Sequence, residues 1–149
     1  MKISPNFTLE EFTFSQTAVR AGIDNSLPPS LMPNLVRLAD TMELVRSILG
    51  NRPIRVSSGY RCQELNKAIG GAVASAHMEA LACDFTCPSF GTIHHTAETI
   101  ASILEHFDQL IYEGTWVHIG LSTGYGRREL LTATFPHGKA IYQKGLVNA

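Results

Sequence analysis

The sequence has no long apolar run, no excess of one charge and few cysteines, and each absence excludes a class of protein. No stretch reaches the roughly 20 apolar residues of a membrane-spanning helix, so no membrane insertion is expected. Twelve Lys and Arg balance 13 Asp and Glu, which argues against nucleic acid as a partner. Three cysteines are too few for a disulfide scaffold, and an odd number cannot all be paired. Reduced thiols are therefore expected at Cys62, Cys83 and Cys87.

The 149 residues suffice for one domain with a substantial core and are too few for two. The opening residues 1–12 lack the apolar core of a secretory signal peptide, so we expect synthesis in the cytoplasm without a signal peptide. No internal repeat or low-complexity linker divides the chain. We predict a single domain over residues 1–149 and expect a monomer.

The first helix is indicated by a capping box. Thr8 and Glu11 are spaced so that each side chain can accept a hydrogen bond from the backbone of the other. Phe7 and Phe12 stand at the positions of a hydrophobic staple. This pattern predicts a short helix that begins at about Leu9.

Three further helices follow from the spacing of apolar residues. Apolar residues recur every three or four positions over 31–49 and predict a long helix that ends at Gly50. A short helix is expected over 63–69. The apolar pattern over 97–107 predicts an amphipathic helix, for which Thr96 is the expected N-cap.

Short runs rich in β-branched and apolar residues are typical of strands, and most of them lie in the last third of the chain. They span residues 53–57, 109–112, 116–121, 130–133 and 140–142. Helices first and strands later favour an α+β fold with a central antiparallel sheet over an alternating parallel one.

Two of the six histidines lie among apolar or small residues. His77 precedes Asp84 by seven residues, and Asp84 lies within the apolar run 81–85. A carboxylate in such a run is costly unless it is paired or binds a metal. His118 lies in a strand-like run with apolar neighbours. Two imidazoles and one carboxylate suit a catalytic zinc ion with a fourth position open.

The other candidates have plainer interpretations. Cys83 and Cys87 lie on either side of Asp84 and are rival ligands, although they are more typical of small core or loop residues. The remaining histidines fit solvated surface positions: His94, His95, His106 and His137. Because the spacing of His77 and Asp84 is a weak pattern by itself, ordinary core and surface roles remain open at this point.

The joint pattern is more specific. The sequence contains S-x-G-Y-R at 57–61, then S-x-H-x-x-A-x-A-x-D at 75–84, then W-x-H at 116–118. In this order the motifs resemble those of the zinc D-alanyl-D-alanine carboxypeptidases. That family shares its fold and metal centre with D-Ala-D-Ala dipeptidases, phage L-alanyl-D-glutamate endolysins and the amino-terminal domain of hedgehog proteins. The chain is most similar to the compact phage-associated branch.

The resemblance implies a hedgehog/DD-peptidase-like fold with helices packed on a sheet that carries one zinc ion. It makes His77, Asp84 and His118 the metal ligands, and it makes Arg61 the residue that binds substrate or stabilises the oxyanion. Ser75, beside the metal motif, is the further expected substrate contact. The implied activity is hydrolysis of the peptide stem of bacterial peptidoglycan, of the D-Ala-D-Ala carboxypeptidase or L-Ala-D-Glu endopeptidase type. The implied setting is a phage or prophage lytic enzyme, released through a holin or carried by the particle.

Two positions depart from the family pattern. Ala80 replaces the glycine of S-x-H-x-x-G, which matters if that position needs a positive φ. Thr115 stands where many relatives carry Glu or Asp, three residues before the last histidine. Glu113 is the nearest carboxylate and is our candidate catalytic base. The alternative is a non-catalytic, zinc-containing binding or virion-structural module, for which intact ligands without a base would be typical.

Overall fold

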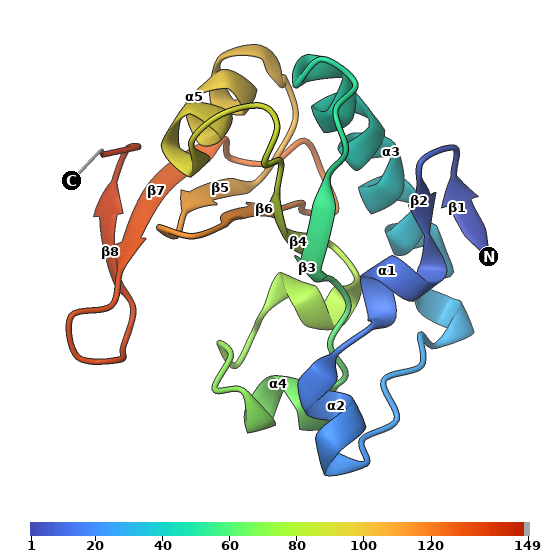
Figure 1. Cartoon of the computed structure of the whole chain (residues 1–149). Coiled ribbons are helices and arrows are strands. Elements are labelled where there is room, and N and C mark those ends of the chain that lie inside the picture. The colour runs from blue at the N-terminus through green and yellow to red at the C-terminus, as the bar shows by residue number, and fades with distance from the viewer. Residues whose placement is uncertain (148–149) are drawn as a thin grey trace.

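A six-stranded mixed sheet organises the fold. In the computed structural model, which describes residues 1–147, the strand order is β3-β4-β6-β5-β7-β8 (Figure 1). The strands are Arg55–Ser58 (β3), Ala82–Thr86 (β4), Gln109–Tyr112 (β5), Val117–Gly120 (β6), Glu129–Thr134 (β7) and Ile141–Lys144 (β8). The predicted strands therefore exist with boundaries shifted by at most two residues, and β4 is a further strand within the apolar run around Asp84.

The prediction of a purely antiparallel sheet is wrong, because β5 and β7 pair in parallel. Strand β6 is flanked by β4 on one edge and by β5 on the other. Strand β6 therefore has no free edge to which the next strand could be added. The chain continues past β5 and adds β7 to the outer edge of β5, and β8 then pairs with β7 as an antiparallel hairpin.

Helices cover one side of this sheet and extend beyond its β3 edge. They are Leu9–Thr13 (α1), Gln16–Ala21 (α2), Met32–Ile48 (α3), Gln63–Ala68 (α4) and Ile93–Ile103 (α5), with single 3₁₀ turns at Pro29–Leu31 (η1) and Ala76–Glu79 (η2). In Figure 1, α3 and α5 lie on one side of the sheet, whereas α2 and α4 lie together at the opposite end of the molecule. A small hairpin of Lys2–Ser4 (β1) and Phe7–Thr8 (β2) contacts α3.

Local sequence signals determine where the helices begin. The capping box is confirmed, because the Glu11 amide donates to Thr8 Oγ1 at 3.2 Å and the Thr8 amide donates to Glu11 Oε1 at 3.0 Å. The rings of Phe7 and Phe12 stack at 5.8 Å. The long helix α3 is also confirmed, and Gly50 follows it with φ 79°.

The prediction for the start of α5 is wrong by one turn. Thr92, not Thr96, is the N-cap, and its Oγ1 accepts from the His95 amide at 3.1 Å. Thr96 lies inside the helix and donates to the Thr92 carbonyl. Because both threonines stand one turn apart on the same face, the apolar pattern alone cannot choose between them. His94 and His95 therefore lie in the first helical turn rather than in a loop.

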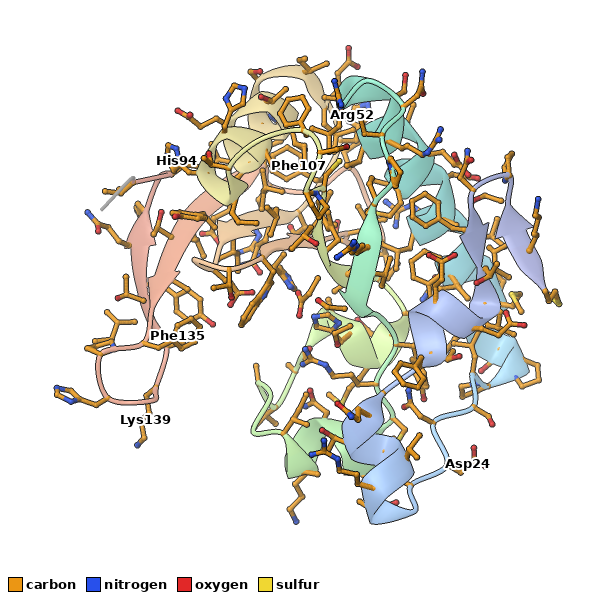
Figure 2. The ribbon with its side chains drawn as sticks, viewed as in Figure 1. Asp24, Arg52, His94, Phe107, Phe135 and Lys139 are labelled. Carbon is orange, nitrogen blue, oxygen red and sulfur yellow. The ribbon has the colours of Figure 1, made fainter. Side chains whose placement is uncertain are left out.

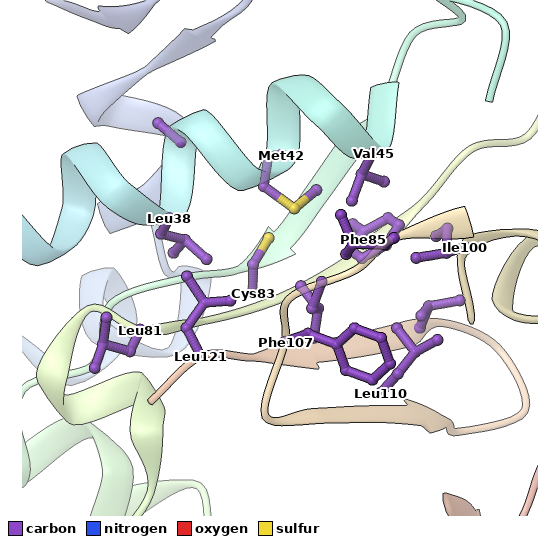
Figure 3. Packing of buried hydrophobic residues seen from close by; sticks show 14 of the residues in the cluster. Leu38, Met42, Val45, Leu81, Cys83, Phe85, Ile100, Phe107, Leu110 and Leu121 are labelled. Carbon is purple, nitrogen blue, oxygen red and sulfur yellow. The ribbon is translucent and has the colours of Figure 1, made fainter. Parts of the chain in front are cut away.

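The core lies between the covered face of the sheet and the two long helices (Figure 3). Leu38, Met42 and Val45 of α3 pack with Phe85 of β4 and Ile100 of α5, and all five are fully buried. Their burial fixes β4 in place, which matters for the site because Asp84 lies in the same strand and faces the other side.

Candidate metal centre

A single turn and an unusual backbone conformation place His77. Ser75 is the N-cap of η2, and its Oγ accepts from the His77 amide at 3.2 Å. At the other end of the turn Ala80 adopts the left-handed conformation, with φ 57° and ψ 34°. The position at which the family carries glycine thus does require a positive φ here. The turn then delivers the chain directly into β4.

Strand pairing brings Asp84 and His118 together. Asp84 of β4 lies directly opposite His118 of β6, so their side chains share one face of the sheet. Asp84 Oδ1 lies 2.8 Å from His118 Nδ1 and 3.4 Å from His77 Nε2. One ligand atom from each of the three residues lies within 4.8 Å of the others.

The hydrogen bond on the far side of the His77 ring determines its tautomer. His77 Nδ1 lies 2.6 Å from the Gly59 carbonyl oxygen, which can only accept, so Nδ1 carries the proton. Nε2 then presents a lone pair to the Asp84 carboxylate, which is also an acceptor. Two buried acceptors 3.4 Å apart need either a proton or a metal ion between them, and the back-side bond to a carbonyl is the usual support of a metal-binding histidine.

Burial and charge keep these groups in the forms that bind a metal. Burial lowers the pKa of His77, against the opposing effect of Asp84, so its imidazole is neutral at neutral pH. Burial alone would raise the pKa of Asp84, but the neighbouring His118 and His77 imidazoles hold it well below its usual range. A neutral imidazole beside an ionised carboxylate is the state in which both can act as ligands.

The three residues lie close enough together to hold one metal ion. Ligands about 2.0–2.1 Å from a tetrahedral zinc lie about 3.3 Å from one another; His77 Nε2 lies 3.4 Å from Asp84 Oδ1, and His118 Nδ1 lies closer to it, at 2.8 Å. His77 and Asp84 are buried and His118 is partly exposed. Three ligands of this kind would leave a fourth coordination position for water or substrate.

Arg61 lies on the other side of Asp84. Its Nη2 donates to Asp84 Oδ2 at 3.3 Å, its Nε to Ser58 Oγ at 3.1 Å and its Nη1 to Asn66 Oδ1 at 3.4 Å. One N–H on each terminal nitrogen remains for a ligand. Arg61 also lines a cavity of about 360 Å³ together with Leu65.

The turn that carries Arg61 is fixed by a close backbone approach. The Tyr60 amide donates to the Phe12 carbonyl at 2.7 Å, and the Arg61 amide donates to the His77 carbonyl at 3.0 Å. A Cβ on Gly59 would lie 2.5 Å from that Phe12 oxygen, so only glycine fits there. The S-x-G-Y-R motif therefore ties β3, α1 and the His77 turn to one another.

Asn66 is a site residue for which the sequence reasoning predicted no role. It is buried, accepts from Arg61 Nη1 and donates to the Ala72 carbonyl at 2.9 Å. Gly71 is required next to it, because a Cβ there would collide with Asn66 Oδ1. The sequence feature that could have indicated Asn66 is the pair of glycines at 70–71, which follows the short helix in which Asn66 is a polar residue next to Leu65.

Glu113 lies at the end of β5 and reaches toward the same face. Its Oε2 accepts from Trp116 Nε1 at 2.8 Å. Burial and the nearby charge of Asp84 raise the pKa of Glu113 above its usual value, and His118 and Arg61 act in the opposite direction. A carboxylate influenced by all three of these site residues belongs to the surroundings of the centre, and its raised pKa makes it a better proton acceptor than an ordinary glutamate.

The structure separates the remaining candidates from this cluster. Ser75 caps the turn of His77 through its Oγ, while its role as a substrate contact remains a prediction. Cys62, Cys83 and Cys87 are free thiols, and the metal-binding group does not include them. Burial raises the pKa of Cys83 well above its usual value, so this thiol stays protonated in the core.

Comparisons with known proteins agree with this geometry. The family model described as Peptidase M15 matches residues 5–120, which include all three motifs and the whole His77, Asp84 and His118 cluster. No curated protein matches the chain. Within residues 1–147, the structure has no helix long and apolar enough to cross a membrane.

Proposed function

The chain belongs to the Peptidase M15 family, and from this membership we propose that it is a zinc-dependent metallopeptidase that hydrolyses the peptide stem of bacterial peptidoglycan. The observation that carries the proposal is the pair of buried acceptors at the centre, His77 Nε2 and Asp84 Oδ1, 3.4 Å apart and completed by His118. A zinc ion held by these three residues would activate water and polarise the scissile carbonyl.

The residues around the centre would bind the substrate and transfer protons. Arg61 would use its two remaining N–H groups to bind a substrate carboxylate or the negative charge that develops on the carbonyl oxygen. Glu113 would take a proton from the attacking water and deliver it to the leaving amine. Burial of His77 and Asp84 excludes bulk water and strengthens the interactions of both groups with ligand and ion.

The finer assignments are part of the same proposal. The resemblance to the compact phage-associated branch favours a phage or prophage cell-wall lytic enzyme that reaches its substrate after holin-mediated release or on a phage particle. The bond cut is of the D-Ala-D-Ala or the L-Ala-D-Glu type. A non-catalytic, zinc-containing module of the same fold is the second candidate, which Thr115 at the usual base position favours.

The test is hydrolysis of purified peptidoglycan by protein in three states: zinc-loaded, chelator-treated and zinc-restored. We expect new amino groups to appear with the first and third states only, and identification of the new terminal residue distinguishes the two bonds. His118→Ala should be inactive in all states, whereas His106→Ala, which changes an exposed histidine outside the cluster, should behave as wild type. Intact peptidoglycan after treatment with protein that holds a full equivalent of zinc would favour the non-catalytic module.

A further inference from the structure

Three aromatic side chains gather at the end of the sheet that carries Glu113. The rings of Trp116 and Phe135 lie 6.3 Å apart at 38°. Tyr142 of β8 pairs with Ala133 of β7, two residues before Phe135. Phe135 and Tyr142 expose 43% and 55% of their surface although both are large and apolar. We call Trp116, Phe135 and Tyr142 the aromatic wall.

The aromatic wall lies on the same face of the sheet as the metal centre. Glu113 bonds to the Trp116 carbonyl across the β5–β6 turn, and the β5–β7 register continues toward Ala133, so Trp116, Glu113, Ala133 and Tyr142 form one row. Asp84, His118, Ile111 and Leu131 form another row, in which the β5 residue Ile111 is two positions from Glu113. Because side chains alternate with a period of two, both rows point to the uncovered face.

Electrostatic interactions agree with this placement. Burial, followed by the charges of Glu113 and Asp84, raises the pKa of Tyr142. The intermediate row of Phe85, Val117 and Tyr112 points the other way, and the first two of these are fully buried in the core. The side chain of Tyr142 therefore lies on the face of the sheet that carries the metal centre, where substrate would approach.

The hairpin that carries two of these rings lies beyond the family match. The match ends at residue 120, whereas β7 and β8 span Glu129–Thr134 and Ile141–Lys144. In Figure 2 the hairpin extends away from α5, and Phe135 is labelled near its far end. Two rings of the aromatic wall, Phe135 and Tyr142, thus lie outside the matched residues, whereas Trp116 lies within them, and together they are placed where they can determine which substrates fit.

The two ends of the site differ in the chemistry they accept. Arg61, beyond Asp84 on the β3 side, offers a cation with free N–H groups. At the hairpin end the electron-rich ring faces and the Glu113 carboxylate disfavour a negatively charged group. A neutral pyranose ring suits that end, since its flat C–H face can stack on aromatic rings while its hydroxyl and amide groups stay in water. Stem-peptide residues such as alanine and glutamate present only a methyl group or a charge.

We propose that the aromatic wall binds a sugar ring of the glycan strand, on the amino-terminal side of the bond that is cut, while Arg61 binds a carboxylate on the other side. This inference rests on the proposed function. In peptidoglycan the sugar is attached to the first residue of the stem. The orientation therefore places the bond after that residue in the centre, which is the L-Ala-D-Glu bond.

The experiment compares two substrates that differ only in the sugar. One is the free stem peptide, and the other is the same peptide attached to its disaccharide. Phe135→Ala and Phe135→Leu each remove the ring, and the second keeps an apolar side chain of similar size to protect the fold. We expect kcat/KM for the disaccharide peptide to fall about tenfold in both variants, with kcat/KM for the free peptide unchanged. An equal loss on both substrates, or no loss on either, would overturn the proposal.

A binding measurement separates this inference from the proposed function. Trp116 is the only tryptophan of the chain, so its fluorescence reports on the aromatic wall directly. Titration of zinc-loaded protein with the disaccharide alone should give a saturable change that Phe135→Ala abolishes. Tyr125→Ala should retain it, because Tyr125 is 78% exposed and stacks on His106 outside this face.

The outcomes are distinguishable. Protein that binds the disaccharide but cleaves neither substrate would refute the proposed function and support the sugar site. Protein that cleaves the free peptide but gives no fluorescence change with the disaccharide would refute the sugar site and support the proposed function.

Discussion

Glu113 reaches the open face of the sheet from the end of β5, and Trp116 holds its carboxylate there with a 2.8 Å hydrogen bond. We expect Glu113→Gln to keep the fold and one equivalent of zinc but to lose about 100- to 10,000-fold in kcat, because the amide cannot accept the proton of the attacking water. Steady-state kinetics on a stem peptide, with metal analysis of the same sample, checks this.

The matched control is Glu105→Gln, since the Glu105 side chain is strongly exposed and, within residues 1–147, its carboxylate pairs only with the exposed His106. That variant should match wild type in both measurements. Wild-type turnover by Glu113→Gln would exclude this residue as the base, and loss of zinc from it would mean that the carboxylate supports the centre rather than the proton transfer.

Gly59 offers a second test at the scale of one residue. An added Cβ would meet the Phe12 backbone at 2.5 Å, so Gly59→Ala must shift either α1 or the Arg61 turn. We expect a loss of about 2–3 kcal/mol in the free energy of unfolding. Gly124→Ala is the control, because a Cβ there has open space. Urea unfolding of both variants checks the expectation, and equal stabilities would contradict it.

Residue types and spacing made His77, Asp84 and His118 candidates, because a carboxylate among apolar residues demands a partner, and the family resemblance made them the expected ligands. Neither source predicted the contacts around this cluster. Ser75 acts as a helix cap, Asn66 holds Arg61, and Trp116 holds Glu113. Each of these contacts joins residues that only the folded turns bring together, so neither composition nor periodicity indicates them. The positive φ of Ala80 is likewise a backbone property that the presence of an alanine does not indicate.

Among the elements, the start of α1 was predictable because its capping box lies within four consecutive residues. The start of α5 was not, since Thr92 and Thr96 both satisfy the local pattern and the choice depends on how the preceding loop packs. Local signals therefore located four of the five helices and missed α2 (Gln16–Ala21), and they fix the start of a helix only where one candidate cap exists.

Attachment of the β1–β2 hairpin to α3 depends on one carboxylate. Ser4 Oγ donates to Glu43 Oε2 at 2.6 Å, and Asn6 donates to both oxygens at 2.8 Å. Burial would raise the pKa of Glu43, but the hydrogen bonds from Ser4 and Asn6 lower it below its usual value. A lowered pKa in the folded state means that the stabilisation is complete above the ordinary pKa of 4.5 and is lost as the pH falls through the lower folded value.

We therefore expect Glu43→Gln to reduce the free energy of unfolding by about 1 kcal/mol at pH 7, a modest value because the carboxylate is partly solvated. The difference from wild type should shrink as the pH falls below the folded pKa of Glu43. Urea unfolding at a series of pH values measures this, with Glu105→Gln as the control. A difference that does not change with pH would show that shape, rather than charge, holds the hairpin.

For the molecule as a whole, the α+β class followed from the order of patterns, but the sheet order did not. Which edge is free when β7 forms depends on β6 already lying between β4 and β5. The order of strands in the sheet is a long-range property, and the composition of each strand-like run does not indicate it. The uncovered face, on which the centre and the hairpin rings lie, depends on the same topology.

Removal of zinc should destabilise the whole domain, because the three donors join η2, β4 and β6. A metal present at 100 times its dissociation constant adds about 2.7 kcal/mol to the free energy of unfolding, which corresponds to a Tm higher by roughly 10 °C. Thermal unfolding of zinc-loaded and chelated protein checks this. His118→Ala should show almost no zinc-dependent shift, and an equal shift in that variant would contradict the assigned ligands.

The separation in sequence of the three proposed metal ligands determines the order in which they become available during synthesis. His77 and Asp84 leave the ribosome close together, but His118 follows Asp84 by 34 residues. A nascent chain therefore offers only two donors until β6 has emerged and paired with β4. Since two donors bind zinc far more weakly than three, the proposed zinc ion would be acquired after this pairing rather than before it. Possession of the metal would thus mark chains whose central strands are already correctly assembled.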